Sequence, residues 1–167
     1  MARDDEFRMF VAARYNALVR TAFLLAGDRG HAEDLAQSAL IRTYLAWGRL
    51  RAPENADAYA RRTLVRLAAR ARRRRWNGEI PTGHFSEPAV AAPAAADDDV
   101  AVDVRRALAE LPGGQREVLV LRYLDDHSEA ETAALLGISI GTVKSRASRG
   151  LASLRQAGLL ASEGRQA

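Results

Sequence analysis

Side chains that could do covalent chemistry are scarce in this sequence. There is no cysteine, which excludes disulfides, thiolate zinc sites and cysteine nucleophiles. The histidines, at positions 31, 84 and 127, lie too far apart to predict a histidine-based zinc site. The neighbouring carboxylates Glu33 and Asp34 could suggest a magnesium-dependent nuclease, but adjacent residues on a helix point in diverging directions and no partner motif accompanies them. We therefore predict that the chain is not an enzyme and needs no metal or cofactor.

Binding chemistry has many more candidates, and most of them are arginines. The 167 residues include 24 Arg and a single lysine, Lys144. The guanidinium group matches a phosphate bidentately, although a GC-rich genome would also raise the arginine content. Residues 1–78 carry 16 Arg against eight acids, residues 79–110 carry two against seven, and residues 111–167 carry seven basic groups against six acids. A basic block followed by an acidic one predicts separate surfaces with different partners.

Helices must position these groups, because strand signals are nearly absent. Apolar residues at helical spacing predict helices over residues 5–26, 31–47 and 58–76, and we expect Asp57 to cap the third. Residues 48–55 contain Pro53 and are predicted as a loop. The aromatic residues on these helices, Tyr44, Trp47 and Tyr59, are expected to pack in the core. Trp76 could either stack on an unpaired base or close its helix.

The apolar pattern stops after the third helix and returns at Val100. The residues between are rich in proline, alanine and aspartate, and such a composition buries too little apolar area to offset chain entropy. We therefore predict an all-α fold of two small helical domains, 1–77 and 100–160, joined by a flexible linker at 78–99 and followed by a tail at 161–167. Apolar runs interrupted by arginine, and an acidic N-terminus, predict no membrane insertion, no secretory signal and a cytoplasmic location.

The second domain carries the sharpest local signal. Ser128 and Glu131 match a capping box, Gly137 supplies a left-handed turn residue, and Ser139 can cap a last helix over 140–156. Together these features predict a helix-turn-helix with a small, polar outer face that suits the major groove. An amphipathic hairpin with a solvated polar face is the alternative. The residues predicted to contact DNA are Ser139, Gly141, Thr142, Lys144, Ser145, Arg146, Ser148 and Arg149.

Two motifs, in this order along the chain, carry a resemblance to a known family. The first is Ala32-Glu33-Asp34-Leu35-x-Gln37, and the second combines Leu111-Pro112…Arg116-Glu117-Val118-Leu119 with Gly141-Thr142-Val143-Lys144-Ser145-Arg146. Together they resemble the extracytoplasmic-function (ECF) sigma factors, the smallest two-domain members of the sigma-70 family, and above all an actinobacterial SigE-like group. The resemblance covers about residues 5 to 158 and implies a sigma-2 domain followed by a sigma-4 domain.

By this resemblance, the chain directs core RNA polymerase to promoters through the −35 and −10 elements. The residues that match the family segment docking on the clamp helices of the β′ subunit are Glu33, Asp34, Gln37 and Ser38. The β subunit and promoter DNA are further expected partners. Many relatives are also held by an anti-sigma factor, which no motif of this chain identifies. The second domain, with its helix-turn-helix, is the expected reader of the −35 element.

The −10 element is assigned to the first domain by the same resemblance. The loop 49–56 corresponds to the family's specificity loop, which captures a flipped base, and the helix after it would follow the DNA backbone. The candidate residues are Arg51, Asn55, Arg61, Arg62, Arg66, Arg70 and Arg73. Many relatives have Arg-Asn-Leu where this chain has Val65-Arg66-Leu67, and an acid in place of Arg70, which leaves the −10 sequence preference open.

One other function remains in competition with transcription initiation. An autonomous helix-turn-helix regulator would need a dimer and a palindromic operator. The patch Glu33-Asp34-x-x-Gln37 and the long linker argue against such a regulator, because neither has a role in it.

Overall fold

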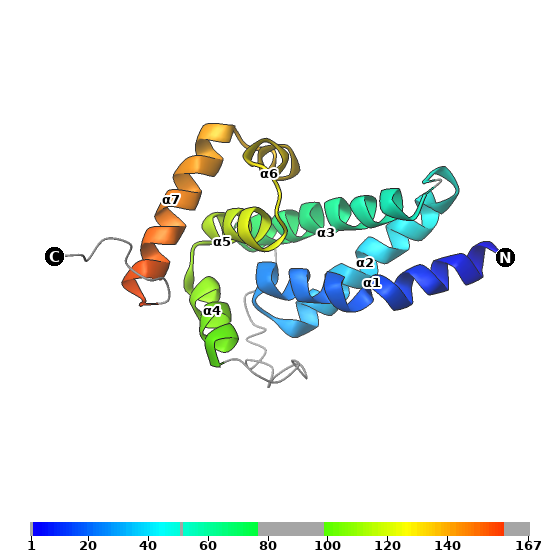
Figure 1. Ribbon diagram of the computed structural model, residues 1–167, viewed down its shortest axis with the longest axis horizontal. Coiled ribbons are helices and arrows are strands. Elements are labelled where there is room, and N and C mark those ends of the chain that lie inside the picture. Colours follow the sequence, from blue (N-terminus) through cyan, green and yellow to red (C-terminus); the bar gives the residue numbers. More distant parts are fainter. Residues whose placement is uncertain (1, 51, 77–98, 159–167) are drawn as a thin grey trace. The chain divides into compact units, whose positions relative to one another are not determined.

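The computed structural model describes residues 2–50, 52–76 and 99–158, and all the regular elements in these ranges are helices (Figure 1). The chain divides into two compact units, Met1–Ala89 and Val90–Ala167. The all-α prediction is therefore confirmed for the described residues. The predicted linker falls outside them, except for Asp99, which begins a helix, and the predicted tail lies outside them entirely.

Three long helices form the first unit: α1 (Arg3–Ala26), α2 (Arg29–Ala46) and α3 (Pro53–Trp76), with a short 3-10 turn, η1 (Trp47–Arg49), after α2. All three helices pack against one another. Their shared core contains the larger side chains Phe10, Leu18, Leu40 and Leu64. Between these lie small residues without solvent exposure, which let the helix axes approach closely: Ala22, Ala32, Ala36, Ala39 and Ala60.

The apolar character of α1 is explained in part by this core, in which 22% of its apolar window is buried. By length and composition alone, α1 is apolar enough to cross a membrane. Its buried residues Phe10, Leu18 and Ala22 instead belong to the same cluster as the alanines of α2 and Leu64 of α3. At its C-terminal end Gly27 adopts a left-handed conformation with φ of 75°, which glycine adopts without the steric cost of a Cβ.

The start of α2 is fixed by a side-chain cap. The Asp28 carboxylate accepts a hydrogen bond from the His31 backbone N–H at 3.0 Å, and the His31 ring nitrogen Nδ1 lies 3.1 Å from the same oxygen. Partial burial by itself would raise the pKa of Asp28, but the hydrogen bonds and charge of His31 outweigh burial, so the pKa lies below its ordinary value.

The predicted start of the third helix was wrong. The helix begins at Pro53, four residues before Asp57, which therefore lies inside it and is not its cap. Proline suits a first helical position because its missing N–H would have no partner there in any case. The Asp57 carboxylate is held by two cations, Arg14 of α1 at 3.5 Å and Arg61 one turn further along α3 at 3.3 Å.

An aromatic cluster closes the end of this bundle. The Phe7 ring lies 4.9 Å from the Tyr44 ring and 5.3 Å from the Trp47 ring, both edge-on. The Tyr44 hydroxyl donates a hydrogen bond to Asp4 at 2.8 Å. The core packing predicted for Trp47 is therefore confirmed. Tyr44 is half-buried at the edge of the core with its hydroxyl exposed, and Tyr59 is half-buried. The side chain of Trp76 lies outside the described residues.

The second unit consists of shorter helices: α4 (Asp99–Glu110), α5 (Gly113–Leu119), α6 (Glu129–Leu136) and α7 (Ile140–Gln156). The residues Val120–Leu124 continue α5 as a π-helical turn, η2. The core is formed by Val118, Val120, Leu121 and Val143, which have no solvent exposure. α7 packs on both α5 and α6, so its inner face is fixed by two neighbouring helices.

Candidate nucleic-acid interface

The turn between α6 and α7 is held by local hydrogen bonds. The Ser128 hydroxyl accepts from the Glu131 backbone N–H at 3.0 Å, and the Glu131 carboxylate accepts from the Ser128 N–H at 2.8 Å. Gly137 ends α6 with φ of 67°, and the Ser139 hydroxyl caps α7 by accepting from the Thr142 N–H at 3.1 Å. The capping box, the glycine turn, the second cap and the bounds of α7 are all confirmed.

α7 separates into an inner and an outer face as predicted. Val143 and Leu154 are buried, and Ala147 and Leu151 are half-buried on the same stripe. Most of the predicted DNA-contacting residues are exposed on the outer face: Ser139, Gly141, Lys144, Ser145, Ser148 and Arg149. Thr142 is half-buried, and its hydroxyl lies 2.9 Å from that of Ser139, so these two groups already bind each other.

Arg146 differs from the other predicted contact residues in its direction. It is half-buried, and its guanidinium lies against the start of α5, where a Cβ on Gly114 would meet its Nη1 at 2.9 Å. In this conformation Arg146 braces α7 against α5. A larger residue at position 114 would displace the guanidinium, which can move because it is the end of a flexible side chain.

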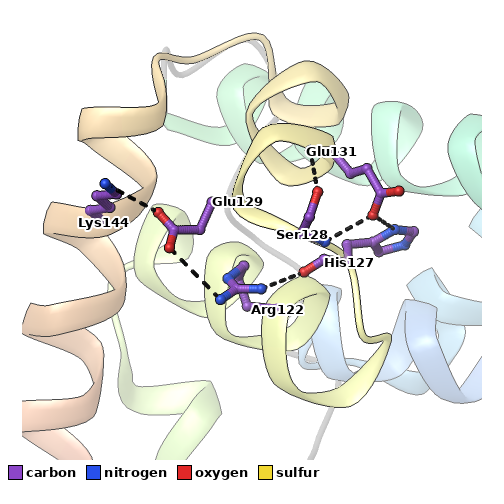
Figure 2. Close-up of polar contacts among 6 residues, drawn as sticks. All are labelled: Arg122, His127, Ser128, Glu129, Glu131 and Lys144. Atoms are coloured by element: carbon purple, nitrogen blue, oxygen red, sulfur yellow. Dashed lines mark hydrogen bonds and ion pairs between the residues drawn. The ribbon is translucent and has the colours of Figure 1, made fainter.

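Lys144 lies in a short chain of charges that sequence reasoning missed (Figure 2). Its Nζ is 3.9 Å from Oε2 of Glu129, the first residue of α6, and Oε1 of Glu129 is 4.0 Å from Nη2 of Arg122 in η2. Arg122 in turn donates through Nη1 to the His127 carbonyl at 2.7 Å. No spacing rule links these residues, because they come from three elements that meet only in the folded unit.

The arginines of α3 form an exposed line. Arg62, Arg66, Arg70 and Arg73 are all exposed and follow one another at intervals of four, four and three residues, which places them on one face of the helix. Four residues of helix rise about 6 Å. The Arg73 guanidinium also donates to the Ala69 carbonyl at 3.4 Å. Arg61 stands apart from this line, because it is paired with Asp57.

The predicted specificity loop borders an apolar cleft. A cavity of about 790 Å³ lies between the first half of α1 and the segment from Trp47 to Ala56. Its apolar walls include Phe10, Trp47, Leu50 and Pro53, and polar groups from α1 stand at its edge. Asn55 lies within this segment, in the first turn of α3, where it is exposed and is not among the residues that line the cleft; Arg51 lies outside the described residues.

The predicted core-binding residues lie on α2, and the structure extends their surface. Asp34, Gln37 and Ser38 are exposed, whereas Glu33 is half-buried and paired with Arg29 at 3.2 Å. Further along the same face, Ile41 and Leu45 are 62% and 72% exposed. The signal for them was present in the sequence, since they follow Asp34 at intervals of seven and eleven residues, off the buried stripe.

Comparison with known proteins decides the family. The family model for Sigma-70 region 2 matches residues 10–78, and the model for Sigma-70, region 4 matches residues 101–154. The chain belongs to the sigma-70 family of RNA polymerase sigma factors. It is 41% identical over 153 residues to the RNA polymerase sigma-E factor of Streptomyces coelicolor, which covers 90% of this chain and 85% of the relative. The ECF RNA polymerase sigma factor SigM of Mycobacterium tuberculosis is 32% identical, over 92% of this chain and 75% of SigM.

A solved structure agrees with these relatives. This sigma factor superimposes with a TM-score of 0.71 and 28% identity on the sigma factor RpoE from Bartonella quintana, which was solved in complex with the anti-sigma factor NepR; the match covers 95% of this chain and 99% of RpoE. The resemblance to ECF sigma factors of the SigE-like group is thus confirmed. This sigma factor directs RNA polymerase to promoters, so it binds core polymerase and promoter DNA, and the autonomous regulator is not favoured.

Proposed function

We propose that this sigma factor divides promoter recognition between its two units, with α3 on the −10 element and α7 on the −35 element. The observation that carries this proposal is that each unit presents one exposed DNA-suited helix face: a line of arginines on α3 and a small, polar face on α7. The domain bounds 1–77 and 100–160 follow the same division. The linker at 78–99 joins the two readers.

The −10 role of α3 rests on charge. Arg62, Arg66, Arg70 and Arg73 supply sequence-independent contacts to phosphates, each phosphate neutralised contributing about −0.9 to the log–log salt slope on duplex DNA. Arg61 contributes less, because its ion pair with Asp57, which Asp57 shares with Arg14, offsets part of its charge. The cleft beside Leu50 and Pro53 is apolar enough to receive an unstacked base. Arg51 and Asn55, from the same stretch of sequence, remain the polar candidates for contacting that base.

The −35 role of α7 rests on its outer face. Gly141, Ser145 and Ser148 are small enough to let the helix enter the major groove, and Lys144 and Arg149 can reach base edges or phosphates. Ser139 and Thr142 contribute mainly by capping the helix, with capacity left to accept one further hydrogen bond. Arg146 serves as a brace for the helix.

The outer face of α2 is the proposed docking surface for core polymerase. Its polar part consists of Asp34, Gln37 and Ser38. Ile41 and Leu45 add an apolar part, and burying it under a partner would stabilise the complex. The clamp helices of the β′ subunit are the proposed partner. Glu33 orients this surface through Arg29 and contributes less directly.

The remaining assignments follow from this role. The chain itself makes and breaks no covalent bond, uses no cofactor and works in the cytoplasm, where polymerase and promoters are found. An anti-sigma factor is included among its partners, because the solved relative RpoE is bound to NepR. Such a partner would inhibit by covering the surfaces that face polymerase or DNA.

A core-binding assay tests the docking surface. Asp34→Arg should weaken binding to core RNA polymerase at least tenfold, because it replaces an acid on the proposed surface with a cation. Asp103→Arg, an equally exposed acid on α4, is the matched control and should bind core normally. Equal binding by both variants and the unaltered chain would refute the assignment of α2.

A further inference from the structure

The charge chain around Lys144 has features that a simple surface ion pair lacks. The side chain of Glu129 is 37% exposed, yet its Oε2 is shielded from solvent and accepts no hydrogen bond from any described residue. A shielded carboxylate oxygen without a donor is costly. The Lys144 ammonium, 3.9 Å away, needs to move by only about 1 Å to come within hydrogen-bonding distance.

A second cation lies on the other side of Glu129. Arg122 reaches Glu129 from η2, and its guanidinium is anchored by the 2.7 Å hydrogen bond to the His127 carbonyl. Figure 2 shows the three side chains in sequence, from η2 through α6 to α7. The Lys144 side chain remains 66% exposed, so it can still reach DNA while Glu129 lies beside it.

A lysine without such a neighbour is a poor reader of sequence. Its flexible stem places a point charge on any nearby phosphate, which adds affinity for every sequence alike. A fixed carboxylate beside the ammonium repels phosphates and restrains the lysine. A neutral acceptor on a base edge is repelled far less, so the acid penalises the unspecific contact more than the specific one.

We propose that Glu129, held by Arg122, is a positioning residue that makes Lys144 selective for the −35 element. This proposal rests on the proposed role of α7 as the −35 reader. It predicts that Glu129 lowers the affinity for unrelated DNA and leaves the affinity for the correct element nearly unchanged. Glu129 therefore increases the preference of the sigma factor for the −35 element over unrelated DNA.

The test uses the full chain assembled with core RNA polymerase. One probe is a promoter duplex whose −35 region has been selected by this holoenzyme from a random library, and the second is the same duplex with that region scrambled. Glu129→Gln should tighten binding to the scrambled duplex about fivefold, as expected for removing one charge 4 Å from a solvated cation. Binding to the selected duplex should change less than twofold, so discrimination falls.

A matched control comes from the same helix. Glu131→Gln removes an equal charge but keeps the capping box, because glutamine can also accept from the Ser128 N–H. It should leave the discrimination ratio, which is the affinity for the selected duplex divided by that for the scrambled duplex, unchanged. In a Lys144→Met background, Glu129→Gln should change the ratio much less, because the cation that Glu129 restrains is absent and only its direct repulsion of phosphates remains.

Each contrary result has a distinct meaning. An unchanged ratio in Glu129→Gln, or an equal change in Glu131→Gln, overturns the proposal. A parallel loss of binding to both duplexes with a lowered melting temperature overturns it as well, since Glu129 would then act only on stability. If Lys144→Met itself leaves the ratio unchanged, Lys144 does not read sequence and this inference fails, whereas the −35 role of α7 fails only if Lys144→Ala with Arg149→Ala also leaves −35 recognition intact.

Discussion

Gly150 of α7 lies so close to Leu119 of α5 that a Cβ at position 150 would meet Leu119 Cδ1 at 2.8 Å. Leu119 is 3% exposed and is packed on other sides, so it has little room to move. This contact limits how closely α7, the proposed DNA-reading helix, can approach α5.

Gly150→Ala should therefore destabilise the protein by about 1 kcal/mol, because overpacking costs about 1–3 kcal/mol and exceeds the gain in helix propensity. Gly141→Ala is the matched control. Its Cβ would meet nothing closer than 3.8 Å, so it should stabilise α7 by up to about 1 kcal/mol. Urea unfolding of both variants checks the opposite signs; a stabilised Gly150→Ala would contradict the close approach.

Arg116 is expected to hold α4 onto the second unit. Its guanidinium donates to the carbonyls of Leu108, Ala109 and Leu111 at 2.7, 2.8 and 3.0 Å, and so satisfies the end of α4. Arg116→Met should cost about 2 kcal/mol in the free energy of unfolding and speed amide hydrogen exchange in α4 first. Exchange that speeds equally in α4 and α7 would show that Arg116 has no special relation to α4.

Two buried threonines should respond oppositely to the same substitution. The Thr132 hydroxyl is fully buried and has no hydrogen-bond partner among the described residues, whereas that of Thr43 donates to the Ala39 carbonyl at 2.7 Å. Thr132→Val should thus stabilise the protein by about 1 kcal/mol, and Thr43→Val should not. Thermal unfolding of the two variants gives the comparison, and a lower melting temperature for Thr132→Val would contradict it.

The cap of α2 should depend on pH. Because the pKa of Asp28 is lowered on folding, its charged form stabilises the native state above the ordinary value of 3.8, and this contribution is lost as the pH falls through the lower folded pKa. Asp28→Ala should cost about 1 kcal/mol at pH 7. The difference from the unaltered chain should shrink as the pH falls below 3.8 and through the lower pKa of the folded state, where the carboxyl gains its proton. A difference independent of pH would refute a role for the charge.

Local chemistry made much of this fold predictable. The capping box at Ser128, the turn at Gly137 and the cap that begins α7 each depend on residues only a few positions apart. Such local features can be predicted directly from the sequence. The first residue of α3 could not be predicted from local sequence alone, because both Pro53 and Asp57 suit a helix start. Asp57 lies inside the helix and pairs across the bundle with Arg14, a residue distant in sequence that no local pattern connects to it.

The sequence predicted on which face of a helix the interface residues lie, but not in which direction their side chains point. Sequence spacing placed Lys144 and Arg146 outside the buried stripe, yet could not show that Arg146 folds against Gly114. Nor could it join Lys144 to Glu129, which lies on another helix. The apolar end of the α2 surface, Ile41 and Leu45, was overlooked because apolar residues on a helix are ordinarily assigned to the core.

The central claim is that the two units read separate promoter elements, and footprinting tests it most directly. In holoenzyme that carries Lys144→Ala with Arg149→Ala, protection should be lost over the −35 element and persist near −10. In holoenzyme that carries Arg62→Ala, Arg66→Ala and Arg70→Ala, the loss should fall near −10, with protection at −35 retained. Protection that weakens equally at both elements in each variant, or that persists unchanged, would contradict the division.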